Sequence, residues 1–416
     1  MALLTKKGTF VAETGTGNKA YTGVGFQPKA LLLFCTAQTA FGSFSAHQVL
    51  AIGFSDGTTE YSCTTFSLDA AATSDAHRRH ASKILTCFDT AGVLNFEASL
   101  VSFDADGFTL NYTDAASSAW QIHYFAIGGD SLTNAKVALF QNATVIGYQA
   151  ITGTGFFPDC LLFIGAMNSN QSPSPAPPST ATNAGFLQMG FAARGAPSQG
   201  GVTTFTEDAA ATSDTANSTA ASYALQGIYN KSGSPAGEGQ AYVASWDVDG
   251  FTLHWSAGTL VASYIGYLAL KGGDYEVLLD FSPLATGTQA LDSVGFQPTG
   301  CLMLAGGVGN AVEADGRFCL GAASAAGIEG FIAGCDNDAA ADMQADMLTK
   351  NDKVIGHVNP GTPTLLTAAD VASFDADSLT LNWTTVDASY AWPFMALVMG
   401  PPPTTTDRRR MLAQVI

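Results

Sequence analysis

Ser-Phe-Asp-Ala-Asp-Gly-Phe-Thr-Leu-Asn-Tyr, residues 102–112, is the stretch that decides the fold. Its second half alternates apolar Phe108, Leu110 and Tyr112 with polar residues, the period of two that is typical of a half-buried strand. The Asp-Gly pair before it supplies the positive-φ residue that a tight hairpin turn needs. The stretch therefore predicts a β-hairpin.

The same hairpin occurs twice more, as Ser-Trp-Asp-Val-Asp-Gly-Phe-Thr-Leu-His-Trp at 245–255 and Ser-Phe-Asp-Ala-Asp-Ser-Leu-Thr-Leu-Asn-Trp at 373–383. Two other landmarks recur with it in the same order. They are a Gly-Phe-x-Pro stretch before an apolar run, with its proline at Pro28, Pro158 and Pro298, and an Asp-Ala-Ala-Ala block that begins at Asp69, Asp208 and Asp338. Three matched landmarks indicate three copies of one unit. We assign the units to 1–130, 131–274 and 275–400, followed by an extended tail, 401–416.

We predict an all-β fold of three tandem antiparallel β-sandwiches, jelly-roll-like, with seven or eight short strands each. Leu110, Leu253 and Leu381 are predicted core positions. The Asp-Ala-Ala-Ala blocks could instead form a turn of helix, because Asp is a good N-cap and Ala the best helix former. Pro393 falls inside the last predicted strand, which indicates that this strand lies at a sheet edge.

Composition narrows the functional classes. The net charge of −18, with only 17 Lys and Arg, argues against nucleic acid as a partner. The seven cysteines form no Cys-x-x-Cys spacing, so we expect buried reduced thiols and neither zinc nor a redox site. The N-terminus has no signal-peptide pattern, and no apolar run reaches the length of a membrane span, so we expect no membrane partner.

Candidate chemistry is sparse. Gly53-Phe-Ser-Asp-Gly57 matches the Gly-x-Ser-x-Gly motif of hydrolases, but its surroundings are all β and the corresponding 190–194 of the second unit has no serine. Asp104-Ala-Asp-Gly107 resembles half of a calcium loop without the remaining ligands, which favours a hairpin turn. We therefore predict no catalytic residue, no metal ligand and no cofactor.

One basic cluster stands out in the acidic chain: His77, Arg78, Arg79 and His80. It is either a docking point for an acidic partner or a glycan, or a solvated loop.

A second basic run, Arg408, Arg409 and Arg410, lies between three prolines and the apolar end of the chain. It predicts an anchor that orders against a neighbouring subunit or an acidic surface, and the alternative is a frayed terminus. Trp120 and Trp392 either pack in the core or stack on sugar rings.

Taken together, the Gly-Phe-x-Pro stretch, the Phe-Asp-x-Asp-Gly-Phe-Thr-Leu hairpin and the Gly-Gly-Asp that closes the first two units resemble virion proteins of tailed bacteriophages. The resemblance covers the three units and not the tail, and in the third unit Gly400 is followed by Pro. It implies a virion location, partners among capsid or tail proteins, and no enzymatic activity. Whether the chain forms a homo-oligomer stays open. The alternative function is carbohydrate binding, with a host-surface glycan as the partner.

Overall fold

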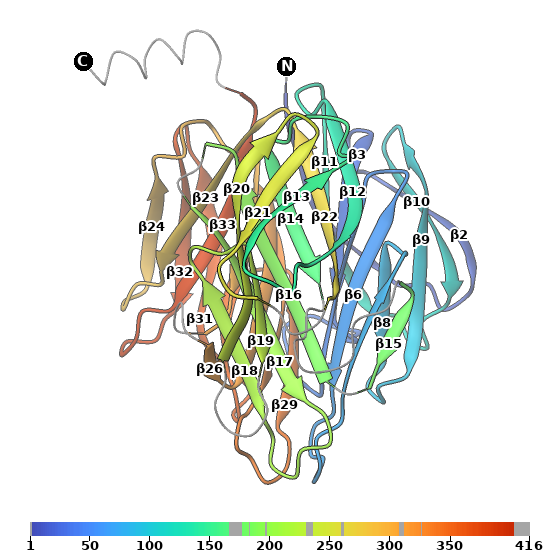
Figure 1. The fold of residues 1–416 in the computed structure, drawn as a ribbon, viewed down its shortest axis with the longest axis vertical. Coiled ribbons are helices and arrows are strands. Elements are labelled where there is room, and N and C mark those ends of the chain that lie inside the picture. Colours follow the sequence, from blue (N-terminus) through green and yellow to red (C-terminus); the bar gives the residue numbers. More distant parts are fainter. Residues whose placement is uncertain are drawn as a thin grey trace.

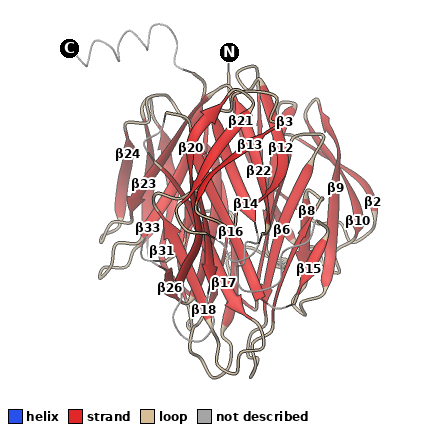
Figure 2. Ribbon diagram, in the orientation of Figure 1, coloured by secondary structure: helices blue, strands red, loops and turns tan. Residues whose placement is uncertain are grey.

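The computed structural model describes residues 2–165, 177–182, 184–195, 198–229, 236–258, 262–307, 312–325 and 327–402. All regular elements in these ranges are β-strands, and they form six antiparallel sheets (Figure 2). The predicted all-β class is confirmed.

The strands fall into three groups in chain order. The first contains β1 (Leu4–Val11), β2 (Gly17–Thr22), β3 (Pro28–Cys35), β4 (Ser45–Ala46), β5 (Gln48–Ser55), β6 (Glu60–Ser67), β7 (Ala76–Ala81), β8 (Leu85–Phe88), β9 (Leu94–Asp104), β10 (Gly107–Asp114) and β11 (Gln121–Gly128). The second contains β12 (Asn134–Gln141), β13 (Gly147–Thr152), β14 (Cys160–Gly165), β15 (Ser179–Ala181), β16 (Ala184–Ala193), β17 (Gln199–Glu207), β18 (Thr215–Ala220), β19 (Leu225–Tyr229), β20 (Ala236–Asp247), β21 (Gly250–Trp255) and β22 (Tyr264–Lys271). The third contains β23 (Asp274–Phe281), β24 (Gly287–Asp292), β25 (Gly300–Ala305), β26 (Val312–Ala314), β27 (Gly316–Ala325), β28 (Ile328–Asp336), β29 (Ala345–Lys350), β30 (Ile355–Asn359), β31 (Thr364–Phe374), β32 (Ser378–Thr385) and β33 (Pro393–Gly400).

Each group builds one two-layer unit from a seven-stranded and a four-stranded sheet. In the first unit the orders are β1-β11-β3-β5-β6-β7-β15 and β2-β10-β9-β8, and the other two units repeat them. In the first unit, β5, β6 and β7 pair as consecutive hairpins in the large sheet, and β8, β9 and β10 do so in the small sheet. The likeness to a jelly roll is therefore limited to the two antiparallel layers.

The seventh strand of each large sheet comes from another unit. β15 of the second unit pairs with β7 of the first, and β26 of the third pairs with β18 of the second. β4 of the first unit pairs with β29 of the third and closes the ring. The three units therefore exchange strands cyclically, and this relates them by one pseudo-threefold axis.

The large sheets are buried on both faces. Leu31 in β3 packs into the sandwich core of its own unit, whereas its neighbour Leu32 packs into a central core to which all three units contribute. The corresponding strands β14 and β25 likewise contribute Leu162 and Leu302 to the central core. Alternate residues along these strands thus serve different cores, which explains why the runs after the prolines are apolar throughout.

The Asp-Ala-Ala-Ala blocks are turns, so the helical alternative is wrong. Ala70, Ala209 and Ala339 have φ values of 57°, 58° and 55°. The three loops bond to one another in a cycle: Ala70 N donates to Met343 O, Ala209 N to Ser74 O, and Ala339 N to Ser213 O, at 2.7–2.9 Å. They gather at the bottom of Figure 1, at the opposite end of the molecule from the N-terminus. Partner loops more than a hundred residues away have replaced the bonds that a helical turn would have made.

The aspartate of each block strengthens this cycle. Asp69 accepts a hydrogen bond from the backbone N of Ala345 (3.0 Å), Asp208 from that of Ala76 (3.0 Å), and Asp338 from that of Thr215 (2.9 Å). Each bond crosses from one unit to another. The Asp-Ala-Ala-Ala block therefore links neighbouring units through hydrogen bonds.

Several further predictions can be compared with the structure. Leu110, Leu253 and Leu381 are fully buried, as predicted, and all seven cysteines are free and buried. Pro393 does not mark an edge: β33 lies between β23 and β25, and Pro393 is only its first residue. A proline tolerates that position because little of the ladder has begun there.

The hairpin aspartates hold each unit together. Asp104 accepts hydrogen bonds from the hydroxyls of Ser102 and Thr109, both at 2.7 Å. Asp106 accepts from the backbone N of Gly25 at 2.6 Å, and Asp249 accepts equivalently from Gly155. The repeated motif therefore ties the hairpin to the turn before the Gly-Phe-x-Pro proline.

Candidate functional site

The basic cluster His77–His80 lies in strand β7, so the alternative of a solvated loop is wrong. Because β7 pairs with β15, the cluster forms the seam between the first and second units. Arg78 and His80 are buried. Arg78 Nη1 donates to the carbonyl of Ala184 at 3.3 Å, and Tyr61 Oη lies 3.1 Å from His80 Nδ1.

The other two members of the cluster are also engaged within the chain. Arg79 forms an ion pair with Glu97 at 2.5 Å and donates to Thr180 Oγ1 of the second unit at 2.9 Å. His77 Nε2 lies 2.7 Å from Asp75. Burial lowers the pKa of Arg78 to about 10, with no carboxylate to offset the desolvation. These contacts give the cluster an internal role, and little of its charge is left for an external partner.

Ser55 does not have the geometry of a nucleophile. It is buried at the end of β5, where its hydroxyl donates to Thr59 O at 3.0 Å and accepts from Gly57 N at 3.1 Å. These are the bonds of the turn into β6. A strand-turn-strand connection lacks the helix that follows the serine of a hydrolase elbow.

Trp120 and Trp392 are both buried, so neither ring offers a face on which a sugar could stack. Trp120 packs in the sandwich core of the first unit. Trp392 Nε1 donates to Asp387 at 3.1 Å, and the guanidinium of Arg317 lies 5.1 Å from its ring centroid. Arg408, Arg409 and Arg410 lie outside the described residues, so the anchor role of the tail stays a prediction.

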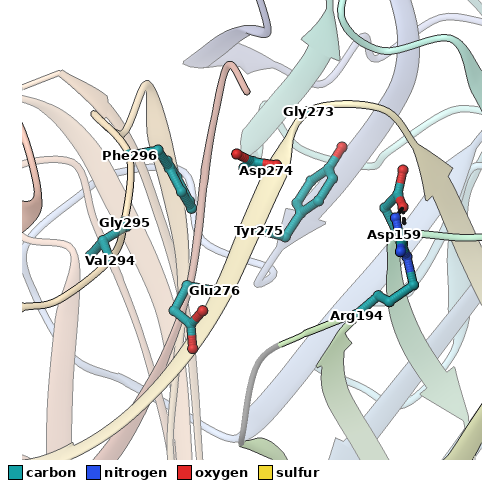
Figure 3. Close-up of a pocket in the computed structure, with 9 residues that line it drawn as sticks. All are labelled: Asp159, Arg194, Gly273, Asp274, Tyr275, Glu276, Val294, Gly295 and Phe296. Atoms are coloured by element: carbon teal, nitrogen blue, oxygen red, sulfur yellow. Dashed lines mark hydrogen bonds and ion pairs between the residues drawn. The ribbon is translucent and has the colours of Figure 1, made fainter. Parts of the chain in front are cut away.

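Among the described residues, a concave site lies where the second unit meets the third, and it has a volume of about 290 Å³ (Figure 3). Its lining is Asp159, Arg194, Gly273, Asp274, Tyr275, Glu276, Val294, Gly295 and Phe296. The turn at Gly272 and Gly273, with φ of 86° at both, carries the chain from β22 straight into β23. This tight turn places Asp274, Tyr275 and Glu276 beside the second unit.

One wall of this pocket is a fixed ion pair. Arg194 Nε donates to Asp159 Oδ1 at 2.8 Å, and the guanidinium also lies over the ring of Phe157, 4.9 Å from its centroid. The second carboxylate oxygen of Asp159 accepts from Gly272 N at 2.7 Å. Asp159 thus joins the arginine to the turn that starts the third unit.

The opposite wall is acidic. Burial raises the pKa of Glu276 to about 7, and its carboxyl group makes no hydrogen bond or ion pair with other residues in the described part of the chain. Tyr275 is buried and donates to Gly272 O at 2.8 Å. The pocket therefore offers a half-buried carboxyl group and a guanidinium to a small polar ligand. Sequence reasoning missed this site because it used the Gly-Gly-Asp and Gly-Phe-x-Pro motifs, which contribute Gly273, Asp274, Gly295 and Phe296 to the lining, only to define the repeat, and nothing in those motifs marks Arg194 or Glu276 as neighbours.

The described ranges have neither a membrane-spanning helix nor a metal-binding cluster of His, Cys, Asp and Glu side chains. No helix there is long and apolar enough to cross a membrane. No group of three or more His, Cys, Asp and Glu side chains there is arranged to hold a metal ion.

Comparison with known proteins adds little. No protein-family model matches the chain, and no curated protein matches it. Among solved structures, the functional form of the mosquito-larvicidal Cry4Aa toxin from Bacillus thuringiensis aligns at 10% identity with a TM-score of 0.12. The alignment covers 96% of this chain, which spans 58% of the toxin chain's length. At that TM-score the likeness carries no argument about fold or function.

Proposed function

We propose that the chain is a non-enzymatic structural component of a bacteriophage virion, located on the capsid or tail surface and acting through protein–protein contacts. The observation that carries the proposal is the cyclic exchange of β4, β15 and β26, which places three similar units around one axis. Such a molecule presents three similar surfaces at fixed positions. A repetitive particle surface is the kind of partner that several linked contacts bind tightly.

Exposed apolar side chains support a role in protein contacts. Val145 and Ile146 on the turn between β12 and β13, and Tyr148 at the start of β13, are 68–74% exposed. In the third unit, Phe281 at the end of β23 and Leu284 on the corresponding turn are 55% and 52% exposed. Clustered exposed apolar residues of this kind are typical of interaction surfaces.

Immuno-electron microscopy of purified particles from a culture carrying the gene tests the proposal. Antibodies raised against the full chain should label the capsid or tail at regular positions. The Ile146→Ser/Tyr148→Ser double variant should incorporate less, whereas Val93→Ser, which changes an exposed apolar residue of the first unit, serves as the matched control. If mass spectrometry of the particles fails to detect the chain, the proposal is wrong.

The pocket in Figure 3 favours a second candidate function, carbohydrate binding at a host surface. Its volume suits one sugar-sized ligand, and a carboxyl group on one side with a guanidinium on the other can accept hydrogen bonds from sugar hydroxyls and donate to them. A glycan array probed with the full chain tests this. Hits that disappear in Glu276→Gln and Arg194→Ala would support it, and an array without hits would dispose of it.

A further inference from the structure

Three equivalent side chains meet on the pseudo-threefold axis just inside the interlocked loops. They are Ser67, Thr206 and Asp336, each two residues before its Asp-Ala-Ala-Ala block. Ser67 Oγ donates to Asp336 Oδ2 at 2.9 Å, and Thr206 Oγ1 donates to the same oxygen. One carboxyl group from the third unit is thus bound by hydroxyls of the other two.

A glutamine joins this group. In β5 Gln48 pairs with Ser67, and directly paired residues of an antiparallel ladder point to the same face. The equivalent partners of Thr206 and Asp336 are Gly185 and Gly316. Of the three equivalent partner positions, only Gln48 therefore has a side chain. That side chain lies over Gly334, where a Cβ would be 2.6 Å from Gln48 Cγ.

The hydroxyl group of Thr204 lies next to these side chains, on the side away from the interlocked loops. Thr204 lies in β17, two residues before Thr206, and faces the axis next to Gly316, where a Cβ would be 3.0 Å from Thr204 Oγ1 and 3.5 Å from Asp336 Oδ2. We call Gln48, Ser67, Thr204, Thr206 and Asp336 the axial ring. All five side chains are at most 2% exposed.

Four polar atoms of the axial ring have no hydrogen-bond partner among the described residues. They are Asp336 Oδ1, Thr204 Oγ1, and both Oε1 and Nε2 of Gln48. Buried polar atoms in native proteins nearly always have a partner, which is protein, water or an ion. Several orphaned atoms in one place therefore indicate a bound group rather than a packing defect.

The chemistry of the ring narrows the identity of that group. A buried carboxylate must be neutralised by a proton or by a cation. The axial ring can offer carboxylate, amide and hydroxyl oxygens to such a cation. It contains neither a thiolate nor an imidazole group. Oxygen-only ligands select hard ions such as Na⁺, K⁺ or Ca²⁺ rather than zinc or copper.

We propose that the axial ring binds one hard cation, with Asp336 Oδ1, Thr204 Oγ1 and Gln48 Oε1 as ligands. The ring itself contributes a single carboxylate, so a monovalent ion matches its charge. The ion links all three units at the place where their large sheets converge. It stabilises the closed ring and has no catalytic role.

Thermal unfolding of the full chain at pH 8 tests this. Unfolding midpoints are compared in choline chloride, NaCl, KCl and CaCl₂ at one ionic strength. A ligand that binds only the folded chain raises the midpoint as its concentration rises. The cation that raises the midpoint decides between a monovalent and a divalent ion.

Variants make the test specific. Asp336→Asn and Gln48→Leu should each abolish the dependence on that cation. Glu276→Gln removes another carboxyl group whose pKa is raised by burial, but outside the axial ring, and should retain it. Crystals soaked in Rb⁺ or a lanthanide should show anomalous density beside Asp336. Midpoints that are equal in all four salts, or a cation effect that persists in Asp336→Asn, would overturn the proposal.

Discussion

The central core and the three sandwich cores differ in the number of units that contribute residues to them. Each sandwich core is formed almost entirely by residues of one unit. Leu110 and Trp120, for example, lie in the sandwich core of the first unit. The central core takes Phe54 from the first unit, Phe191 from the second and Phe318 from the third. A sandwich could bury its own core alone, but none of the units can bury the axial face of its large sheet without the other two. The folding unit is therefore the whole chain, although the repeat is only a third of it.

The largest expected effect comes from the central core. Phe54→Ala removes a fully buried ring there and should lower the free energy of unfolding by about 3–5 kcal/mol. Because all three units share this core, denaturant unfolding should remain a single transition when followed by circular dichroism and by tryptophan fluorescence. A separate transition confined to one unit would show that the cores are independent.

A sandwich core should respond slightly less. Leu110→Ala should cost about 2–5 kcal/mol, because Leu110 is fully buried between the two sheets of the first unit. Asn111→Ala, on the opposite face of β10, is the control and should change stability little. A cost below about 1 kcal/mol for Leu110→Ala would mean that the site collapses around the smaller side chain.

The third prediction concerns pH at the axial end of the central core. Burial, with smaller contributions from Asp346 and Asp69, raises the pKa of Asp336 to about 7 despite the hydrogen bonds from Thr206 and Ser67, which lower it. A carboxyl group whose pKa is higher in the folded state stabilises the fold below its unfolded pKa, near 4, and loses that contribution as the pH rises through 7. In choline buffers the wild-type chain should therefore lose stability from pH 4 to 7 relative to Asp336→Asn, by at least about 1.4 kcal/mol, the equivalent of one pKa unit.

The measurement is the difference in unfolding midpoint between wild type and Asp336→Asn across that pH range. Taking the difference cancels the titration of groups that do not interact with Asp336, such as Glu276, whose pKa is also raised by burial. Parallel pH profiles for the two proteins would contradict the prediction.

The smallest effect is expected at a seam. Arg79→Met keeps the apolar stem but removes the contacts to Glu97 and Thr180, and it should cost about 1 kcal/mol. Arg194→Met is the comparison, because its ion pair with Asp159 is nearly half exposed on the arginine side and should contribute less. Chemical denaturation of both variants at low salt measures the difference. Equal costs would show that burial at the seam does not strengthen the pair.

Much of each unit was predictable because its signals are local. The turn at Gly107, the alternation around Leu110 and the prolines before the buried strands all depend on neighbours in sequence. The assembly of the units was not predictable. Asp69 looked like a helix N-cap, but its carboxylate accepts from Ala345, and nothing near residue 69 encodes that partner. Arg78 looked like a surface charge for the same reason: β15 and Ala184, which cover it, belong to the second unit, and nothing near residue 78 encodes them.

Fusing the three units into one chain has a consequence for the axis. In an assembly of three identical subunits, any residue on the axis occurs three times, so a carboxylate at the position of Asp336 would face two copies of itself at short range. Here Ser67 and Thr206 occupy the other two places. Because the three units belong to one chain, the three equivalent positions on the axis can carry different side chains. The molecule can thus hold a single buried carboxyl group there, which identical subunits could not.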